Sequence, residues 1–170
     1  MKRSRSSRSR NSPAGRRTAG ERKRAIIAPA TLPPPRGFSH GILVRGGALL
    51  FLAGQDASDA QGHITAPGNL VGQFAQVLQN LKAVVEAAGG TLQDVMKLNI
   101  YVRDRGAYLA NLKSLGQVFR IYFGTHYPAM ALFEVSGFFR EAALIEMEGL
   151  AVVEQPSAAK RATKRAPRKR

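Results

Sequence analysis

Two segments of the chain carry apolar residues at the three- and four-residue spacing that places them on one face of an α-helix. The first, from about Asn69 to Ala88, carries Leu70, Phe74, Val77, Leu78, Leu81, Val84 and Val85, and Gly89-Gly90 follows as a stop. The second begins after Asp104-Arg105-Gly106, runs to about Phe123 and carries Leu109, Leu112, Leu115, Val118, Phe119 and Tyr122. We therefore expect two amphipathic helices, each with one face buried against a core.

Five further segments have the composition and alternation of β-strands. Gly41–Arg45 and Ala48–Ala53 are joined by Gly46-Gly47, which can adopt the positive φ of a tight turn, so we expect a hairpin there. The remaining strands are expected at about Ala129–Val135, Ala143–Val153 and Val95–Arg103, and the segment 56–68 is expected to be a surface loop. The order β-β-α-β-α-β-β predicts an α/β fold of the α+β type, a mixed sheet with two helices on one face.

The other face of this sheet has no predicted helix to cover it. Residues 48–53 read Ala-Leu-Leu-Phe-Leu-Ala, and successive side chains of a strand point to opposite faces. Both faces of this strand should therefore be removed from water. We favour association with further copies of the chain as the cover, and the alternative is a monomer in which loops cap the second face.

The formal net charge of +15 is concentrated at the two ends of the chain. Residues 1–36 contain eleven Lys and Arg with one acid, residues 156–170 contain seven with none, and residues 37–155 hold eight bases and ten acids. We therefore expect basic disordered tails at 1–36 and 156–170 around a nearly neutral domain at 37–155. Without interleaved aromatic rings, the tails offer only non-specific attraction to nucleic acid or another polyanion, and a solubilising extension with no partner is the alternative.

Several kinds of chemistry are excluded or disfavoured by the composition. The chain has no cysteine, which rules out disulfides, thiolate nucleophiles and Cys-ligated metal centres. His40, His63 and His126 are widely spaced in predicted loops, so we expect neither a metal nor another cofactor. No run of about 18 apolar residues and no apolar signal segment is present. We expect a cytoplasmic protein without a membrane partner, with an organelle transit peptide at the Arg- and Ser-rich start as the alternative.

The last strand places two carboxylates, Glu146 and Glu148, on the same face as Leu150 and Val152. Partial burial disfavours a charged carboxylate, raises its pKa and allows it to exchange protons near neutral pH. Glu146 is therefore a candidate catalytic residue. The alternative is a pair of acids that simply face solvent at the end of a strand.

Nine short stretches of the middle domain occur in the order and spacing of one known family. They are Phe38-Ser39-His40-Gly41, Ala53-Gly54-Gln55, Gln79-Asn80-Leu81, Ala87-Ala88-Gly89, Asp94-Val95-Met96-Lys97, Tyr101-Val102-Arg103-Asp104, Tyr127-Pro128-Ala129, Phe133-Glu134-Val135 and Ile145-Glu146-Met147-Glu148. In these the domain resembles the Rid (reactive intermediate deaminase, YjgF-like) family. The resemblance implies a fold like that of chorismate mutase and a homotrimer, with its sheets at the centre and three clefts for a small-molecule ligand between subunits.

In members of that family with deaminase activity, an arginine two residues after the proline of the Pro-Ala motif binds the carboxylate of a 2-imino or enamine acid. A glutamate in the last strand helps to position the hydrolytic water. Glu146 matches that glutamate, whereas Met130 stands at the arginine position and the sequence places no neighbouring arginine to replace it. The resemblance further implies ligand-binding positions at Gly54, Phe38, Met130 and the backbone of Leu132.

Other departures from the family pattern also make the implied pocket less polar. Phe38 replaces a usual tyrosine, Ala53 a frequent serine and Gly116 an asparagine. One hypothesis is a hydrolase for a small imine or enamine that lacks a carboxylate, with weak or absent turnover of 2-iminopropanoate-type substrates. The other is a non-catalytic trimer that binds a small ligand and is tethered to nucleic acid or another polyanion by its tails.

Overall fold

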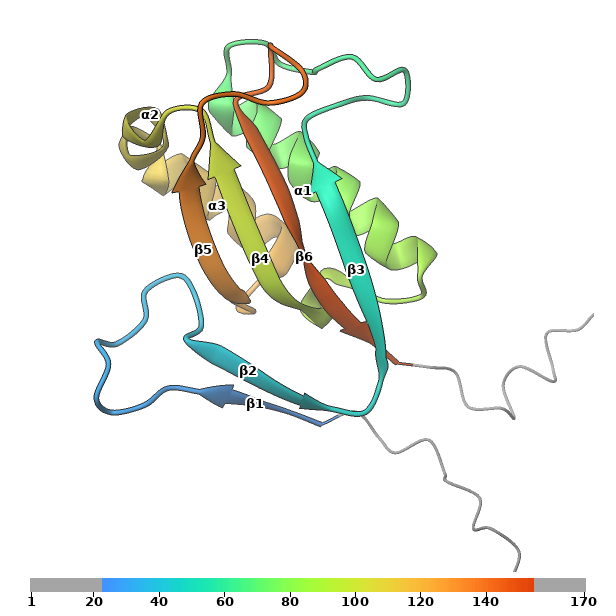
Figure 1. The fold of residues 1–170 in the computed structure, drawn as a ribbon, viewed down its shortest axis with the longest axis vertical. Helices are drawn as coiled ribbons and strands as arrows, with labels where there is room; N and C mark the ends of the chain where they lie inside the picture. Colours follow the sequence, from blue (N-terminus) through green and yellow to red (C-terminus); the bar gives the residue numbers. More distant parts are fainter. Residues whose placement is uncertain (1–22, 155–170) are drawn as a thin grey trace, which may run out of the picture.

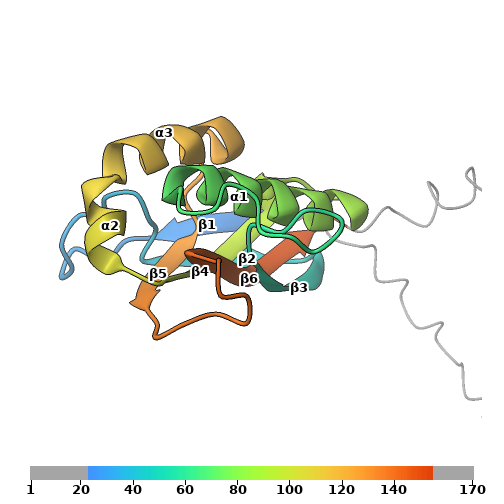
Figure 2. The same ribbon diagram turned by 90° about the horizontal axis from the view of Figure 1, so that it is seen from above.

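The computed structural model describes residues 23–154, which fold into a layer of helices on one face of a β-sheet (Figures 1 and 2). The sheet has the strand order β3-β6-β4-β5. Its strands are β3 (Ala48–Gln55), β4 (Val95–Val102), β5 (Ala129–Glu134) and β6 (Ile145–Val153). β4 and β5 run parallel, whereas β6 is antiparallel to both β3 and β4, so the predicted mixed sheet is confirmed.

The first long helix, α1 (Leu70–Ala87), has the bounds that its apolar stripe predicts. Asn69 caps its start, since its Oδ1 accepts a hydrogen bond from the Gly72 amide at 3.0 Å. Gly89 follows its end with a φ of 82°, a conformation that glycine adopts without steric cost. A short 3-10 helix, η1 (Leu92–Asp94), then leads the chain into β4.

The second predicted helix is divided into α2 (Arg105–Ala110) and α3 (Leu112–Phe123). The break lies at Asn111, whose Nδ2 donates to the Ala107 carbonyl at 2.9 Å. Such a local side-chain bond competes with the continuous ladder of helix hydrogen bonds. Leu109 and Leu112, on either side of this break, are 44% and 50% exposed, whereas Leu115 at the next turn is buried.

The start of the chain differs from the prediction. A strand β1 (Lys23–Ile27) pairs antiparallel with β2 (Gly41–Arg45) in a separate two-stranded sheet, so a disordered tail over the whole of 1–36 is wrong for these residues. The expected hairpin between β2 and β3 is also wrong, because Gly46 and Gly47 direct the chain into a different sheet. Residues 1–22 and 155–170 lie outside the described residues, and the prediction for them stays a prediction.

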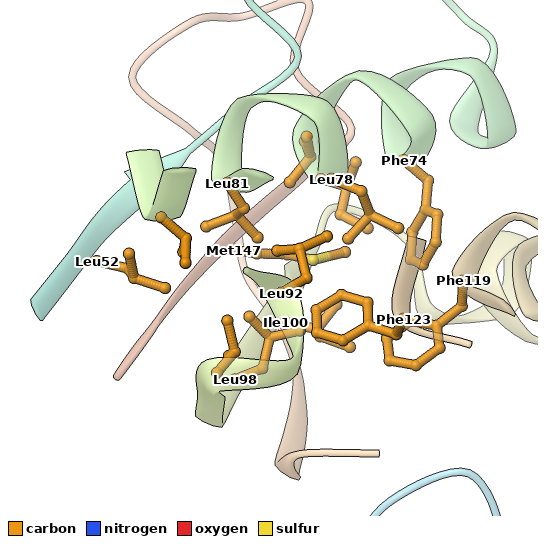
Figure 3. Close-up of a cluster of buried hydrophobic side chains, with 14 of the residues drawn as sticks. Leu52, Phe74, Leu78, Leu81, Leu92, Leu98, Ile100, Phe119, Phe123 and Met147 are labelled. Atoms are coloured by element: carbon orange, nitrogen blue, oxygen red, sulfur yellow. The ribbon is translucent and has the colours of Figure 1, made fainter. Parts of the chain in front are cut away.

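Apolar side chains fill the space between the sheet and the two long helices (Figure 3). The labelled residues come from α1 (Phe74, Leu78, Leu81), from α3 (Phe119, Phe123), from η1 (Leu92) and from the strands (Leu52, Leu98, Ile100, Met147). The rings of Phe119 and Phe123 stack with centroids 4.4 Å apart. Since burial of each such side chain stabilises the fold by roughly 1.5–3 kcal/mol, this layer fixes the helices on the sheet.

The opposite face of the four-stranded sheet remains open in the single chain. Leu49 and Phe51 of β3 are 56% and 71% exposed, and Phe133 of β5 is 48% exposed. Figure 2 shows α1 and α3 on the same side of the sheet. The prediction of helices on one face is therefore confirmed, and association through the other face stays a prediction.

Candidate functional site

The two acids of β6 are Glu146 and Glu148. They alternate along the strand with the buried side chains of Ile145 and Met147, so they lie on the open face of the sheet. Glu148 Oε1 accepts hydrogen bonds from the Tyr101 hydroxyl at 2.6 Å and from Asn99 Nδ2 at 3.2 Å. These two bonds stabilise the carboxylate and lower the pKa of Glu148, and the same contact raises the pKa of the Tyr101 hydroxyl. The hydrogen bonds therefore favour the ionised form of Glu148, which makes it a poor candidate for proton transfer.

Glu146 has the opposite electrostatics. Its partial burial, followed by the negative charges of Asp56 and Glu148, raises its pKa, and the guanidinium of Arg140 opposes this shift only in part. Its carboxyl group lies against the backbone of Gly54: a Cβ there would overlap Oε1 and come within 3.0 Å of Cδ. The absence of a side chain at Gly54 therefore makes room for a carboxyl group whose pKa is raised above its usual range.

A cavity of about 610 Å³ adjoins Glu146 and is lined mainly by polar groups. Arg140, in the loop between β5 and β6, connects this loop to the one between β3 and α1. Its Nη1 binds Asp56 Oδ2 at 2.7 Å, and its Nε donates to the Gly62 carbonyl at 2.9 Å. Asn80 of α1 donates from Nδ2 to the carbonyls of Asp56 and Ser58, both at 2.9 Å. We call this space the acid cavity, and its walls are held by these bonds.

The other predicted ligand-binding residues line a second cavity, of about 540 Å³, which we call the apolar cavity. Phe38, Met130 and Leu132 all contribute to it, as does Gly116 of α3. Within one chain the structure thus separates the predicted residues into two groups. Gly54 and Glu146 line the acid cavity, and the remaining three line the apolar cavity.

Sequence reasoning missed the arginines of both cavities. Arg36 and Arg120 line the apolar cavity beside Met130, which corrects the expectation that no arginine lies near that position. For Arg120 a signal existed, since it follows Gly116 by four residues and so shares its helix face. Arg140 lies in the loop between β5 and β6. A loop has no helix or strand periodicity from which the direction of a side chain could be predicted.

Residues 23–154 contain neither a candidate metal site nor a membrane-spanning helix. This part of the chain has no group of three or more His, Cys, Asp or Glu side chains that could hold a metal ion. None of its helices has both the length and the apolar character needed to cross a bilayer.

Comparison with known sequences finds relatives along most of the described chain. The family model described as endoribonuclease L-PSP matches residues 29–153. A RutC family protein of Pyrococcus horikoshii is 34% identical over 129 residues, which are 76% of this chain and 98% of the relative. A RutC family protein of Saccharolobus solfataricus is 33% identical over 127 residues, covering 74% and 95% of the two chains.

Solved structures give the same result. A Yersinia pestis protein of the conserved Rid family is 36% identical, with a TM-score of 0.69 over 76% of this chain and 98% of that one. The YjgF gene product of E. coli is 28% identical, with a TM-score of 0.53 over 75% and 94% of the two chains. The likeness therefore extends over nearly the whole length of these proteins.

Proposed function

The chain belongs to the endoribonuclease L-PSP family of Rid and RutC proteins, and from this membership we propose that it hydrolyses a small reactive imine or enamine. Glu146 is the proton-transfer residue. It accepts a proton from water as the oxygen bonds to the imine carbon, and it returns the proton to the nitrogen. The hydroxyl proton of the resulting carbinolamine then passes through Glu146 to the nitrogen as the carbon–nitrogen bond breaks and the carbonyl forms, which releases ammonia and a carbonyl compound. The observation that carries this proposal is the raised pKa of a carboxyl group seated in a cavity.

The proposal includes a homotrimer with its ligand clefts between subunits. Two observations support it. The exposed apolar side chains of Leu49, Phe51 and Phe133 give the open sheet face a surface suited to a second copy. The division of the family positions between two cavities also suits a cleft in which the apolar cavity of one copy meets Glu146 of its neighbour.

A Glu146→Gln substitution tests the catalytic part of the proposal, because glutamine keeps the shape of the side chain and cannot accept the proton. We expect imine hydrolysis to fall by about 10²–10⁴-fold, the usual contribution of a general base. Glu86→Gln is the matched control, since Glu86 lies exposed on α1 outside both cavities and pairs with Lys82 at 3.8 Å. Equal turnover by wild type and Glu146→Gln would exclude this role.

A second candidate, non-catalytic ligand binding by a trimer tethered to nucleic acid or another polyanion, is favoured by the charge of the chain ends. Residues 155–170 alone carry seven Lys and Arg and no acid. The test is retention on immobilised DNA as salt rises, comparing the full chain with one lacking residues 1–22 and 155–170, so that β1 is kept. A strong salt dependence that the shortened chain loses supports the tether, and equal retention contradicts it. A cytoplasmic location is part of both candidates.

A further inference from the structure

The acid cavity contains an ion pair in addition to Glu146. Asp56 and Arg140 line the cavity together with Glu146, and Arg140 Nη1 lies 2.7 Å from Asp56 Oδ2. The side chain of Asp56 is 11% exposed and that of Arg140 is 38% exposed, so water screens the two charges only in part. We call Asp56 and Arg140 the cavity pair. Its charges act on a third group in the same cavity more strongly than those of a fully exposed pair would.

The carboxylate of the cavity pair is held in place by three contacts. Asp56 Oδ1 accepts a hydrogen bond from the Ser58 amide at 3.1 Å, and the Asp56 carbonyl accepts one from Asn80 Nδ2 at 2.9 Å. The third contact is the charge-assisted bond from Arg140 to Oδ2. Rotation of this carboxylate would break at least one of these bonds, so its negative charge stays at one place in the cavity.

The segment between Arg140 and Glu146 is held as firmly, by the buried Gln73 of α1. Gln73 Nε2 donates to the Ala142 carbonyl at 2.9 Å, and its Oε1 accepts from the Leu144 amide at 2.8 Å. These two bonds fix the backbone directly before β6. The guanidinium of the cavity pair and the carboxyl group of Glu146 therefore keep one relative position.

Further titratable groups of the described chain lie near Glu146. Asp59 lines the acid cavity, Glu148 lies on the same face of β6, and Tyr101 of the neighbouring strand β4 bonds to Glu148. Burial is the first cause of the raised pKa of Glu146. The carboxylate of the cavity pair and then Glu148 raise it further, whereas the guanidinium of the pair lowers it.

We propose that Asp56 and Arg140 are positioning residues for Glu146, and that the balance of their two charges sets the protonation state of its carboxyl group. The carboxylate of the pair favours the protonated form of Glu146, and the guanidinium favours the ionised form. Both residues act through Glu146 and not on the substrate. The catalytic value of this arrangement rests on the proposed function, whereas the effect on Glu146 itself does not.

The test is a titration of the Glu146 carboxyl group by carbon-13 NMR, in the full chain labelled at the side-chain carboxyl carbon of glutamate. The signal of Glu146 is the one that Glu146→Gln lacks. Arg140→Gln should move the midpoint of this titration up by roughly 0.5–1 pH unit, and Asp56→Asn should move it down by a similar amount. Asparagine keeps an oxygen for the Ser58 amide, so only the charge is removed. The double variant should titrate between the two single variants.

Two sets of control variants separate charge from support of the fold. Arg140→Lys keeps the positive charge and should titrate nearer to wild type than Arg140→Gln does. Lys82→Gln and Glu86→Gln each break another ion pair, an exposed one at 3.8 Å on α1 outside the cavity lining, and should leave the titration unchanged. If Arg140→Gln does not fold, Arg140→Met replaces it, because its apolar side chain can keep the contact with the Phe139 ring.

Shifts of opposite sign are the result that a purely structural role would not give. Loosened loops would admit water in both variants, and better hydration lowers the pKa of a buried carboxyl group in each case. The inference is overturned if the two shifts have the same sign, or if neither exceeds the shifts of the α1 controls.

Imine hydrolysis gives a second measurement of the same effect. The pH midpoint of kcat/KM should rise in Arg140→Gln and fall in Asp56→Asn, following the NMR titration. Failure of the proposed function looks different from failure of the inference. In that case Glu146→Gln would keep imine turnover, while the NMR titrations of the Asp56 and Arg140 variants still shifted in opposite directions.

Discussion

Replacing Gly54 with alanine should displace the carboxyl group of Glu146 without disturbing the fold. Gly54 is not among the glycines with positive φ, so its backbone conformation is open to alanine. The new methyl group would overlap Glu146 Oε1 and lie 3.0 Å from Cδ, and the end of this flexible side chain must move aside by about 1 Å. A misplacement of that size costs about a hundredfold in kcat/KM, or ~2.7 kcal/mol of transition-state stabilisation.

The assay is imine hydrolysis, with thermal unfolding measured on the same samples. Gly41→Ala serves as the matched control, because its added methyl group would meet only Ile27 Cβ at an ordinary 3.6 Å. We expect both variants to keep the wild-type Tm and only Gly54→Ala to lose activity. Wild-type kcat/KM in a fully folded Gly54→Ala protein would refute the placement of the reaction beside Glu146.

Three further predictions concern stability and pH. Leu81→Ala removes a fully buried side chain and should cost about 2–5 kcal/mol in urea unfolding, against less than about 0.5 kcal/mol for Ile121→Ala, which is 80% exposed. Burial lowers the pKa of His126 from 6.5, so the unfolded chain binds its proton more readily and stability should fall as pH drops through 6.5. A His126→Gln variant should lose this pH dependence. Because burial raises the pKa of Glu146 above 4.5 and only the ionised form accepts a proton, kcat/KM should rise with pH, with a midpoint above 4.5.

The secondary structure could be predicted where a single periodicity dominates a segment. The stripe from Leu70 to Val85 fixes α1, and in β4 the two-residue period of a strand puts Leu98, Ile100 and Val102 on one side, which is the buried side. β1 was missed because Lys23 and Arg24 continue the basic composition of the segment before them, and the pairing that makes this segment a strand is supplied by β2. The Gly46-Gly47 turn was identified, but turn residues alone do not specify which sheet the next strand joins.

The candidate site could be predicted residue by residue, and its spatial arrangement could not. Strand alternation places Glu146 on the open face, and the family pattern identifies Gly54 beside it. Gly54 and Glu146 line a different cavity from Met130. This separation depends on distances across the sheet, which the spacing of residues along the chain does not give. Arg140 likewise reaches Asp56 across 84 positions of sequence, so no local pattern could indicate the pair.

A subunit-mixing experiment tests most directly whether two copies of the chain build one catalytic site. Glu146→Gln inactivates the acid cavity, and Met130→Glu places a negative charge in the apolar cavity. Each variant alone should be inactive. If the two cavities meet across a subunit interface, unfolding and refolding an equal mixture should restore activity at about a quarter of the sites. A mixture no more active than its two components, with mixed assemblies confirmed by mass, would contradict the shared site.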